Sequence, residues 1–565
     1  MQVKSWLVGT ITLLVCSVAA TKVAGQHPES RESQNITIKV RTNFVQVAVL
    51  VQKSGKHVPA LEKRNFALQQ DGKNEPIATF EEVHAAAAVP RGGNDQEFSN
   101  TSDAANKARP IAIIAIDTVN TSLIDQAYFK EEFLKFLGEA DEGMPIGLVE
   151  LTRTGVRVLH DFTTDPKALL AAVKKKNPTQ PTRNSDKSPM IKEEADVAAQ
   201  KLELRDEVYA GQAQMRFDNA ARLQETEDEM TQFQDRAARY DTLASLQQLA
   251  QALKGLPGRK TLLWVGSGFE FFGGTQRVKG IVNLAQGGTN FGEVLDQHAY
   301  TSKLLSDADV AVYPIDTRRT VNTAYEVMNP SQRYTPLASQ REIVRQTDRE
   351  ILDTFRQMAA ETGGKPCIFR TDLHECMREA MQDNAAYYML GFYVDKTRSA
   401  PGWHRIKVTL DENATLRYRP GFFIAPNNSE AFRSMDLGLA LNSPFDYTAL
   451  PFHGRFSGFR ENGTKKSAEF EVNIPSGSVA IEEDSGKMNF DVLVVVRAMG
   501  GAEVARVGQR IDRKLTVQNI ADIKAEGIYY KNKIDLAPGK YGVWLVLRDN
   551  LTGRTGSAVF PLTVP

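Results

Sequence analysis

The sequence predicts an α/β domain with a doubly wound parallel sheet and a helical insertion, flanked by a small β module and a C-terminal β-sandwich. Three observations lead to this prediction. Apolar strand patterns alternate with helical patterns across residues 109–393. A charged stretch over 174–256, proline-containing up to residue 189 and of helical periodicity from about 190, interrupts that alternation. Over residues 443–565, short strand patterns separated by proline-glycine turns follow one another at the spacing typical of a sandwich.

The stretch 111–117 is the predicted centre of the α/β domain. Six of its seven residues are apolar, and four of those are isoleucine. A short β-branched run without alternation is typical of a strand buried on both faces of a parallel sheet. It ends at Asp117, and a helical pattern follows after a few small polar residues. Asp117 is therefore expected at the carboxyl end of a strand, where open α/β sheets place their ligand sites.

The N-terminus has the pattern of a secretory signal peptide over residues 1–25. Lys4 precedes a short apolar run that ends in small residues, and the run is too short for a comfortable membrane span. No second long apolar run follows, so we expect an exported chain, periplasmic or secreted, with no transmembrane span after cleavage. Lys+Arg and Asp+Glu number 69 each, so the overall charge gives no reason to expect nucleic acid as a partner.

A small β module is predicted over residues 36–83, followed by a linker over 84–108. Apolar residues alternate from Ile36 to Val51. A second strand from Asn65 closes at the Asp71-Gly72 turn, and residues 76–80 are predicted as its return strand. The linker assignment rests on the many Ala, Gly, Asn and Ser residues there.

Within the α/β domain, Asp165 and Pro166 are expected to begin a helix as N-cap and first residue. The insertion is predicted to be a loop followed by a helical hairpin or coiled-coil arm that breaks near Gly211. Its apolar positions include Met230, Phe233 and Tyr240. A solvated surface helix without a partner is the alternative.

The strands expected over residues 394–424 can pair with the N-terminal module, which would make the α/β domain an insertion in one β domain. Beyond residue 443 the predicted strands are 470–474, 490–497, 513–517, 529–536, 537–549 and 557–564.

Two cysteines lie outside the signal peptide, Cys367 and Cys376. In an oxidising compartment such a pair is a candidate disulfide, and two separate buried thiols are the alternative that the spacing leaves open. Zinc bound by these cysteines and His374 would lack a fourth ligand at any standard spacing.

Several short phrases lie in a consistent order over residues 36–424. They are Asp117-x-Val119-x-Thr121, Ala60–Phe66 with Gln70–Gly72, Leu256–Lys260, Tyr313–Asp316, Thr362–Gly364 and Tyr387–Phe392. In these phrases the chain resembles the von Willebrand factor type A family, the α/β fold of integrin I domains, and more closely the VWFA-related proteins of acidobacterial type.

The resemblance implies a metal-ion-dependent adhesion site, built in this family from Asp-x-Ser-x-Ser, a loop threonine and a further aspartate. Asp117 matches the first acid, Thr121 the second hydroxyl, and Thr242 is the candidate loop threonine. Val119 replaces the first serine, and residues 266–268 lack the last acid. One carboxylate and two hydroxyls make a degenerate site, so we expect no cofactor or only weakly bound Mg²⁺ or Ca²⁺. The alternative is that Asp117 only holds the turn by accepting backbone N–H bonds.

A phosphotransferase or hydrolase of haloacid-dehalogenase type is the competing hypothesis, with Asp117 as nucleophile. The acid/base aspartate of that class is replaced here by Val119. Other catalytic motifs are absent from the sequence as well. The sequence therefore predicts a non-enzymatic binding or assembly protein whose partner is an unknown protein or cell-envelope component.

Overall fold

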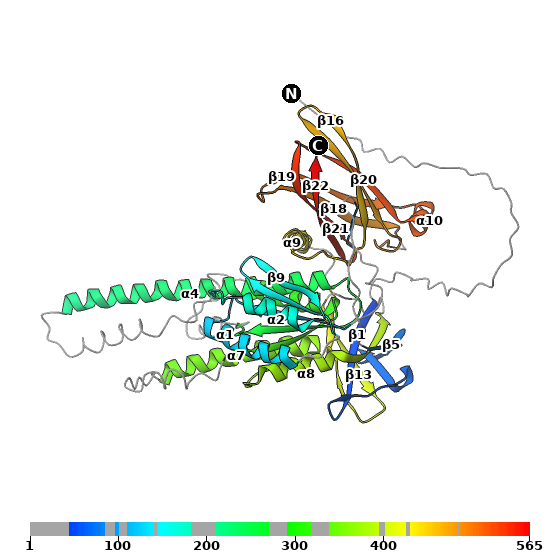
Figure 1. The fold of residues 1–565 in the computed structure, drawn as a ribbon. Helices are drawn as coiled ribbons and strands as arrows, with labels where there is room; N and C mark the ends of the chain where they lie inside the picture. The colour runs from blue at the N-terminus through cyan, green and yellow to red at the C-terminus, as the bar shows by residue number, and fades with distance from the viewer. Residues whose placement is uncertain are drawn as a thin grey trace, which may run out of the picture. The chain divides into compact units, whose positions relative to one another are not determined.

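The structure is a computed structural model and describes residues 44–84, 97–100, 110–139, 144–181, 210–269, 291–318, 338–394, 400, 402–424, 430–482 and 485–565 (Figure 1). The predicted signal peptide and the strand pattern at residues 36–40 lie outside these ranges. Among the helices of the described residues, none is long and apolar enough to cross a membrane.

A five-stranded sheet in the order β11-β10-β7-β8-β9 forms the centre of the α/β region. Its strands β7, β8, β10 and β11 are parallel, and β9 is an antiparallel edge. The strands are β7 (Ile111–Asp117), β8 (Ile146–Thr152), β9 (Gly155–Thr163), β10 (Lys260–Gly266) and β11 (Val310–Asp316). Strand β7 is the middle strand, so Asp117, its last residue, lies at the carboxyl end of the central strand.

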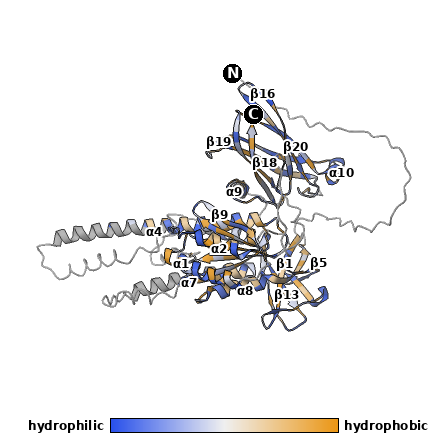
Figure 2. Cartoon of the chain, in the orientation of Figure 1, coloured by the Kyte–Doolittle hydropathy of each residue, from blue (hydrophilic) through white to orange (hydrophobic). Residues whose placement is uncertain are grey.

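Helices cover both faces of this sheet, which explains its apolar strands (Figure 2). One face packs against helices α1 (Leu123–Glu139), α2 (Pro166–Lys175) and α8 (Leu373–Ala385). The other packs against α4 (Ala210–Leu253), α5 (Phe291–Asp307) and α7 (Ala338–Thr362). Ile113 and Ala115 of β7 face the second group, whereas Ile114 and Ile116 face the first. Asp165 caps α2 by accepting a hydrogen bond from the Lys167 backbone N–H at 2.8 Å, and Pro166 is its first residue.

Two further antiparallel sheets enclose one hydrophobic cluster beside the α/β region. They follow the orders β14-β1-β12-β5, with β2 on β1, and β15-β13-β3-β4. Their elements are β1 (Phe44–Lys53), β2 (Lys56–His57), the 3-10 helix η1 (Lys63–Asn65), β3 (Phe66–Gln70), β4 (Lys73–Glu75), β5 (Thr79–His84), β12 (Ala386–Tyr393), β13 (Gly402–Leu410), β14 (Thr415–Arg417) and β15 (Gly421–Ile424). Chain segments before and after the α/β region thus share these sheets. Strand β12, placed in the α/β domain by the predicted boundary at 393, pairs with β1 and β5.

The return strand predicted at residues 76–80 is wrong. Asp71 and Gly72 both have positive φ, 49° and 81°, as a two-residue hairpin turn requires. The chain therefore re-enters the ladder at once, with Lys73 opposite Gln70 in strand β4. Pro76 ends this short strand because it has no N–H to donate.

The C-terminal region contains two four-stranded antiparallel sheets packed around one cluster of buried apolar residues. Their orders are β20-β17-β16-β6 and β19-β18-β21-β22. The elements are β6 (Glu97–Ser99), α9 (Glu430–Leu441), β16 (His453–Asn462), β17 (Lys465–Ile474), β18 (Lys487–Ala498), β19 (Glu503–Lys514), α10 (Val517–Glu526), β20 (Ile528–Leu536), β21 (Gly539–Asp549) and β22 (Thr555–Val564).

Two local predictions in this region are corrected. Residues 513–517 are not a single strand, because Thr516 is the N-cap of α10 and accepts a hydrogen bond from the Asn519 N–H at 3.2 Å. The predicted linker contains strand β6, which pairs with β16. Asn100 directly after it is buried and bonds the Tyr447 and Leu450 carbonyls at 2.7 and 2.9 Å, which fixes this segment against the C-terminal sheets.

Candidate functional site

The three residues of the predicted adhesion site lie together at the carboxyl end of β7. Asp117 ends the strand, Thr121 lies on the turn after it, and Thr242 comes from helix α4. All three are buried, with exposed fractions of 0%, 2% and 0%. The Thr242 hydroxyl lies 3.5 Å from Asp117 Oδ2. The fold therefore brings together side chains separated by 125 positions in the sequence.

Asn120, which sequence reasoning did not single out, occupies the centre of this site. Its side-chain Nδ2 donates to Asp117 Oδ2 and to the Thr242 hydroxyl, both at 2.8 Å. The NH₂ group of Asn120 therefore lies between Asp117 Oδ2 and the Thr242 hydroxyl, where a bound cation would otherwise bridge these two oxygens. The sequence signal was the amide side chain three residues after the aspartate, within reach of an Asx-type turn.

Both carboxylate oxygens of Asp117 accept hydrogen bonds. Oδ1 accepts from the backbone N–H groups of Val119 at 3.0 Å and Asn120 at 3.2 Å. Oδ2 accepts from Asn120 and also from the Trp264 indole N–H at 3.3 Å. Burial raises the pKa of Asp117 above its usual 3.8, and the donors from Asn120, Trp264 and Val119 oppose this shift.

At residues 266–268, where the family's last acid is missing, the backbone packs directly against Asp117 and Thr121. A Cβ added to Gly266 would lie 2.9 Å from both Asp117 Cβ and the Thr121 hydroxyl. That hydroxyl accepts a hydrogen bond from the Ser267 N–H at 3.2 Å. A divalent cation does not fit this arrangement, because it would have to displace the N–H donors that already surround the carboxylate. The geometry corresponds to the alternative in which Asp117 holds the turn.

A second group of hydroxyl and carboxyl side chains lies next to this site. Ser122 and Ser267 both donate to Asp125 Oδ2, at 2.9 and 3.2 Å. The Thr317 hydroxyl lies 3.4 Å from that of Ser267. Asp316, at the end of β11, is paired with Arg318 through two contacts of 2.9 Å. The Asp316 carboxylate is therefore neutralised by a cation of the chain itself.

Four of the other phrases that carry the resemblance, at 256–260, 313–316, 362–364 and 387–392, meet at a second buried polar cluster, centred on Arg259. Its guanidinium donates to the Tyr313 hydroxyl at 3.1 Å and to the Gly363 carbonyl at 3.0 Å. Its backbone N–H donates to the Tyr387 hydroxyl at 2.7 Å. Tyr313 in turn donates to Asp383 at 3.2 Å. These phrases therefore join the central sheet to strand β12.

Cys367 and Cys376 are joined by a disulfide, with Cα atoms 6.0 Å apart. Cys367 forms a parallel bridge with Ile315 of β11, and Cys376 lies in the first turn of α8. The bond therefore ties the start of α8 to the edge of the central sheet.

No family model matches this sequence, and no curated protein matches it either. Weak similarity to solved structures exists. The pilus adhesin SpaC from Lactobacillus rhamnosus GG is 9% identical with a TM-score of 0.23, and the match covers 89% of this chain and 58% of that chain. A von Willebrand factor type A protein from Catenulispora acidiphila is 10% identical with a TM-score of 0.21, over 63% of this chain and 75% of that chain. Similarities at this level assign neither fold nor function.

Proposed function

We propose that this chain is an exported, non-enzymatic binding or assembly protein, and that helix α4 carries its binding surface. The observation behind the proposal is a row of exposed apolar side chains on α4: Met230, Phe233 and Tyr240, with exposed fractions of 53%, 68% and 54%. Their spacing of three and seven residues places them along one face of a helix. Exposed apolar residues gathered on one face are typical of interaction sites.

The architecture of α4 suits such a role. Its 44 residues correspond to a rod of roughly 66 Å. The C-terminal part is anchored in the core of the α/β region through Leu243, Leu246, Leu249 and Leu253. The N-terminal part extends beyond the central sheet (Figure 1). One end is thus held rigidly while the apolar row remains available to a helix of a partner protein.

The buried carboxylate of Asp117 argues against the phosphotransferase alternative. A nucleophile needs a free lone pair directed at the substrate, and both Asp117 oxygens are engaged by N–H donors in a position without solvent exposure. We therefore expect no phosphatase or hydrolase turnover above background from the purified chain with p-nitrophenyl phosphate or ester substrates. Turnover that disappears in Asp117→Asn would overturn the non-enzymatic assignment.

The binding role of α4 is tested by capture from cell-envelope fractions. Replacing Phe233 by aspartate places a charge at the centre of the apolar row, so we expect at least about tenfold weaker binding of the captured partner. Dissociation constants for the purified partner, measured for the original chain and the variant, provide the comparison.

Val517→Asp is the matched control, because Val517 is an apolar residue 86% exposed on a different helix, α10. It should leave binding unchanged. Equal affinities of the original chain and Phe233→Asp would exclude α4 as the binding surface. If the partner helix belongs to a second copy of this chain, sedimentation of the purified chain alone will show a dimer.

A further inference from the structure

A histidine and two glutamates from helices α1 and α8 lie close together, away from the site at Asp117. They are Glu139, the last residue of α1, and His374 and Glu375 in the first turn of α8. Their ligand atoms all lie within 4.8 Å of one another. In the part of the chain that the structure describes, this is the group of three such side chains close enough to hold one metal ion.

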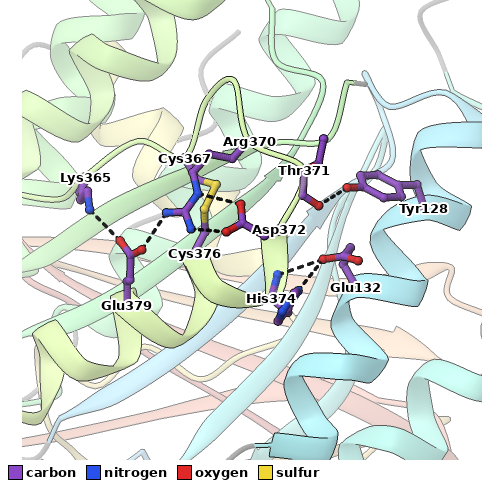
Figure 3. The surroundings of a disulfide bond; sticks show 10 residues. All are labelled: Tyr128, Glu132, Lys365, Cys367, Arg370, Thr371, Asp372, His374, Cys376 and Glu379. Carbon is purple, nitrogen blue, oxygen red and sulfur yellow. Dashed lines mark hydrogen bonds and ion pairs between the residues drawn. A yellow bond between two sulfur atoms is a disulfide. The ribbon is translucent and has the colours of Figure 1, made fainter. Parts of the chain in front are cut away.

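A buried carboxylate outside the group orients the imidazole of His374. Glu132 of α1 is 3% exposed, and its Oε2 lies 2.7 Å from His374 Nδ1 (Figure 3). The same oxygen accepts a hydrogen bond from the His374 backbone N–H at 3.3 Å, and Glu132 Oε1 is paired with the Lys135 ammonium at 2.6 Å. An ionised carboxylate only accepts, so His374 Nδ1 is the donor. In the neutral imidazole the lone pair is then on Nε2, the nitrogen nearer Glu375.

This arrangement is the one that proteins use around metal-bound histidines. The ring nitrogen that does not bind the metal donates to a carboxylate, which fixes the tautomer and raises the basicity of the other nitrogen. Glu375 Oε1 lies 3.9 Å from His374 Nε2, so both can approach one ion from the same side. Glu139 is exposed and free to rotate toward the ion. Its carboxylate lies at the negative end of the α1 dipole, where a cation is favoured.

We propose that Glu139, His374 and Glu375 form a binding site for a divalent transition metal, with Zn²⁺ as the best match. One imidazole and two carboxylates suit Zn²⁺, whose bonds to such ligands are about 2.0–2.2 Å, and a water completes the tetrahedron. The ion links the end of α1 to the start of α8. The same first turn of α8 is held from the other side by the Cys367–Cys376 disulfide (Figure 3).

Arg378 competes with the metal. Its Nε donates to Glu375 Oε2 at 3.1 Å, and its positive charge also attracts the carboxylate of Glu139. This side chain is 52% exposed, so it can leave for solvent when an ion binds. The positive charge of Arg378 thus offsets the repulsion between the two carboxylates in the absence of an ion.

Isothermal titration of Zn²⁺ into the full chain, first cleared of metal with a chelator, tests the site. We expect one ion per chain and at least a hundredfold loss of affinity in His374→Ala. Glu132→Gln removes no ligand. We expect it to lower the Zn²⁺ affinity tenfold to a hundredfold, as is usual for a carboxylate that orients a metal-bound histidine. Arg378→Gln should bind more tightly than the original chain. The visible absorption of bound Co²⁺ should change in His374→Ala, since it reports the ligands directly.

Two controls keep the result decisive. His160→Gln removes a histidine whose Nδ1 contacts only a backbone carbonyl among the hydrogen bonds of the described residues, and it should leave Zn²⁺ affinity unchanged. Glu139→Gln alters an exposed side chain without disturbing the fold, and should weaken binding at least tenfold. Absence of Zn²⁺ binding, or equal affinity in Glu139→Gln and the original chain, would overturn the proposal.

Discussion

Replacing Asp117 by alanine should lower the free energy of unfolding by about 3 kcal/mol or more. The substitution removes the acceptor for four N–H groups, from Val119, Asn120 (backbone and side chain) and Trp264. Each hydrogen bond to a charged group contributes about 1.5–3 kcal/mol, and the buried donors would be left without a partner. Urea unfolding of the original chain and the variant measures the difference.

Asp125→Ala is the control, because Asp125 is a half-buried acid one turn away that accepts hydroxyl bonds from Ser122 and Ser267. Asp125→Ala should lower the free energy of unfolding clearly less than Asp117→Ala does. Millimolar Mg²⁺ or Ca²⁺ should leave the midpoint of the original chain unchanged, since a ligand stabilises only above its dissociation constant. An Asp117→Ala chain of unchanged stability would contradict the role of Asp117 in holding the turn. Micromolar binding of either ion that this variant loses would show that Asp117 is a metal ligand.

The pH dependence supplies a second signature of the buried acid. Burial raises the pKa of Asp117 in the folded chain above its usual 3.8, so the folded state binds this proton more tightly than the unfolded state does. The resulting stabilisation is complete below pH 3.8 and is lost as the pH rises through the folded-state pKa. Asp117→Ala should lack this part of the slope of stability against pH.

The sequence predicted those elements that are determined by residues adjacent in the chain. The isoleucine run at 111–117 specified a strand covered on both faces, and Asp165 with Pro166 specified the start of α2. Strand β6 could not be predicted in the same way. Its three residues carry no apolar alternation, and it is held by pairing to β16, more than 350 residues further along the chain.

The candidate site shows the same division. Asp117 and Thr121 could be placed on one turn from their spacing alone. The donors that close the site could not be predicted, because Trp264 is 147 positions from Asp117 and reaches it only once β10 lies beside β7. Met230, Phe233 and Tyr240 illustrate the reverse problem: helical periodicity placed them on one face of α4, but periodicity cannot tell whether that face is buried or exposed.

Arg259→Leu should also destabilise the chain by roughly 3 kcal/mol or more. Arg259 is 3% exposed, and its loss leaves the Gly363 carbonyl without this donor and the Tyr313 hydroxyl without its cation. Chemical unfolding measures the effect. Arg506→Leu is the matched control, because Arg506 is half exposed and paired only with nearby Glu503 among the contacts of the described residues, so its cost should stay within about 0.5 kcal/mol.

The same cluster also predicts coupling between distant parts of the sequence. Arg259 directly precedes β10, Tyr313 lies on the neighbouring strand β11, and the two side chains share one hydrogen bond. Arg259→Leu and Tyr313→Phe should therefore be non-additive by more than about 0.5 kcal/mol. Arg259→Lys should recover little stability, because the bonds to Tyr313 and Gly363 both come from Arg259 Nη2, a position that the shorter lysine side chain does not reach. Additive costs, or full recovery by lysine, would show that Arg259 and Tyr313 do not act as one unit. The Arg259 backbone N–H also donates to Tyr387 of β12, so a coupled pair would lie where the central sheet meets that strand.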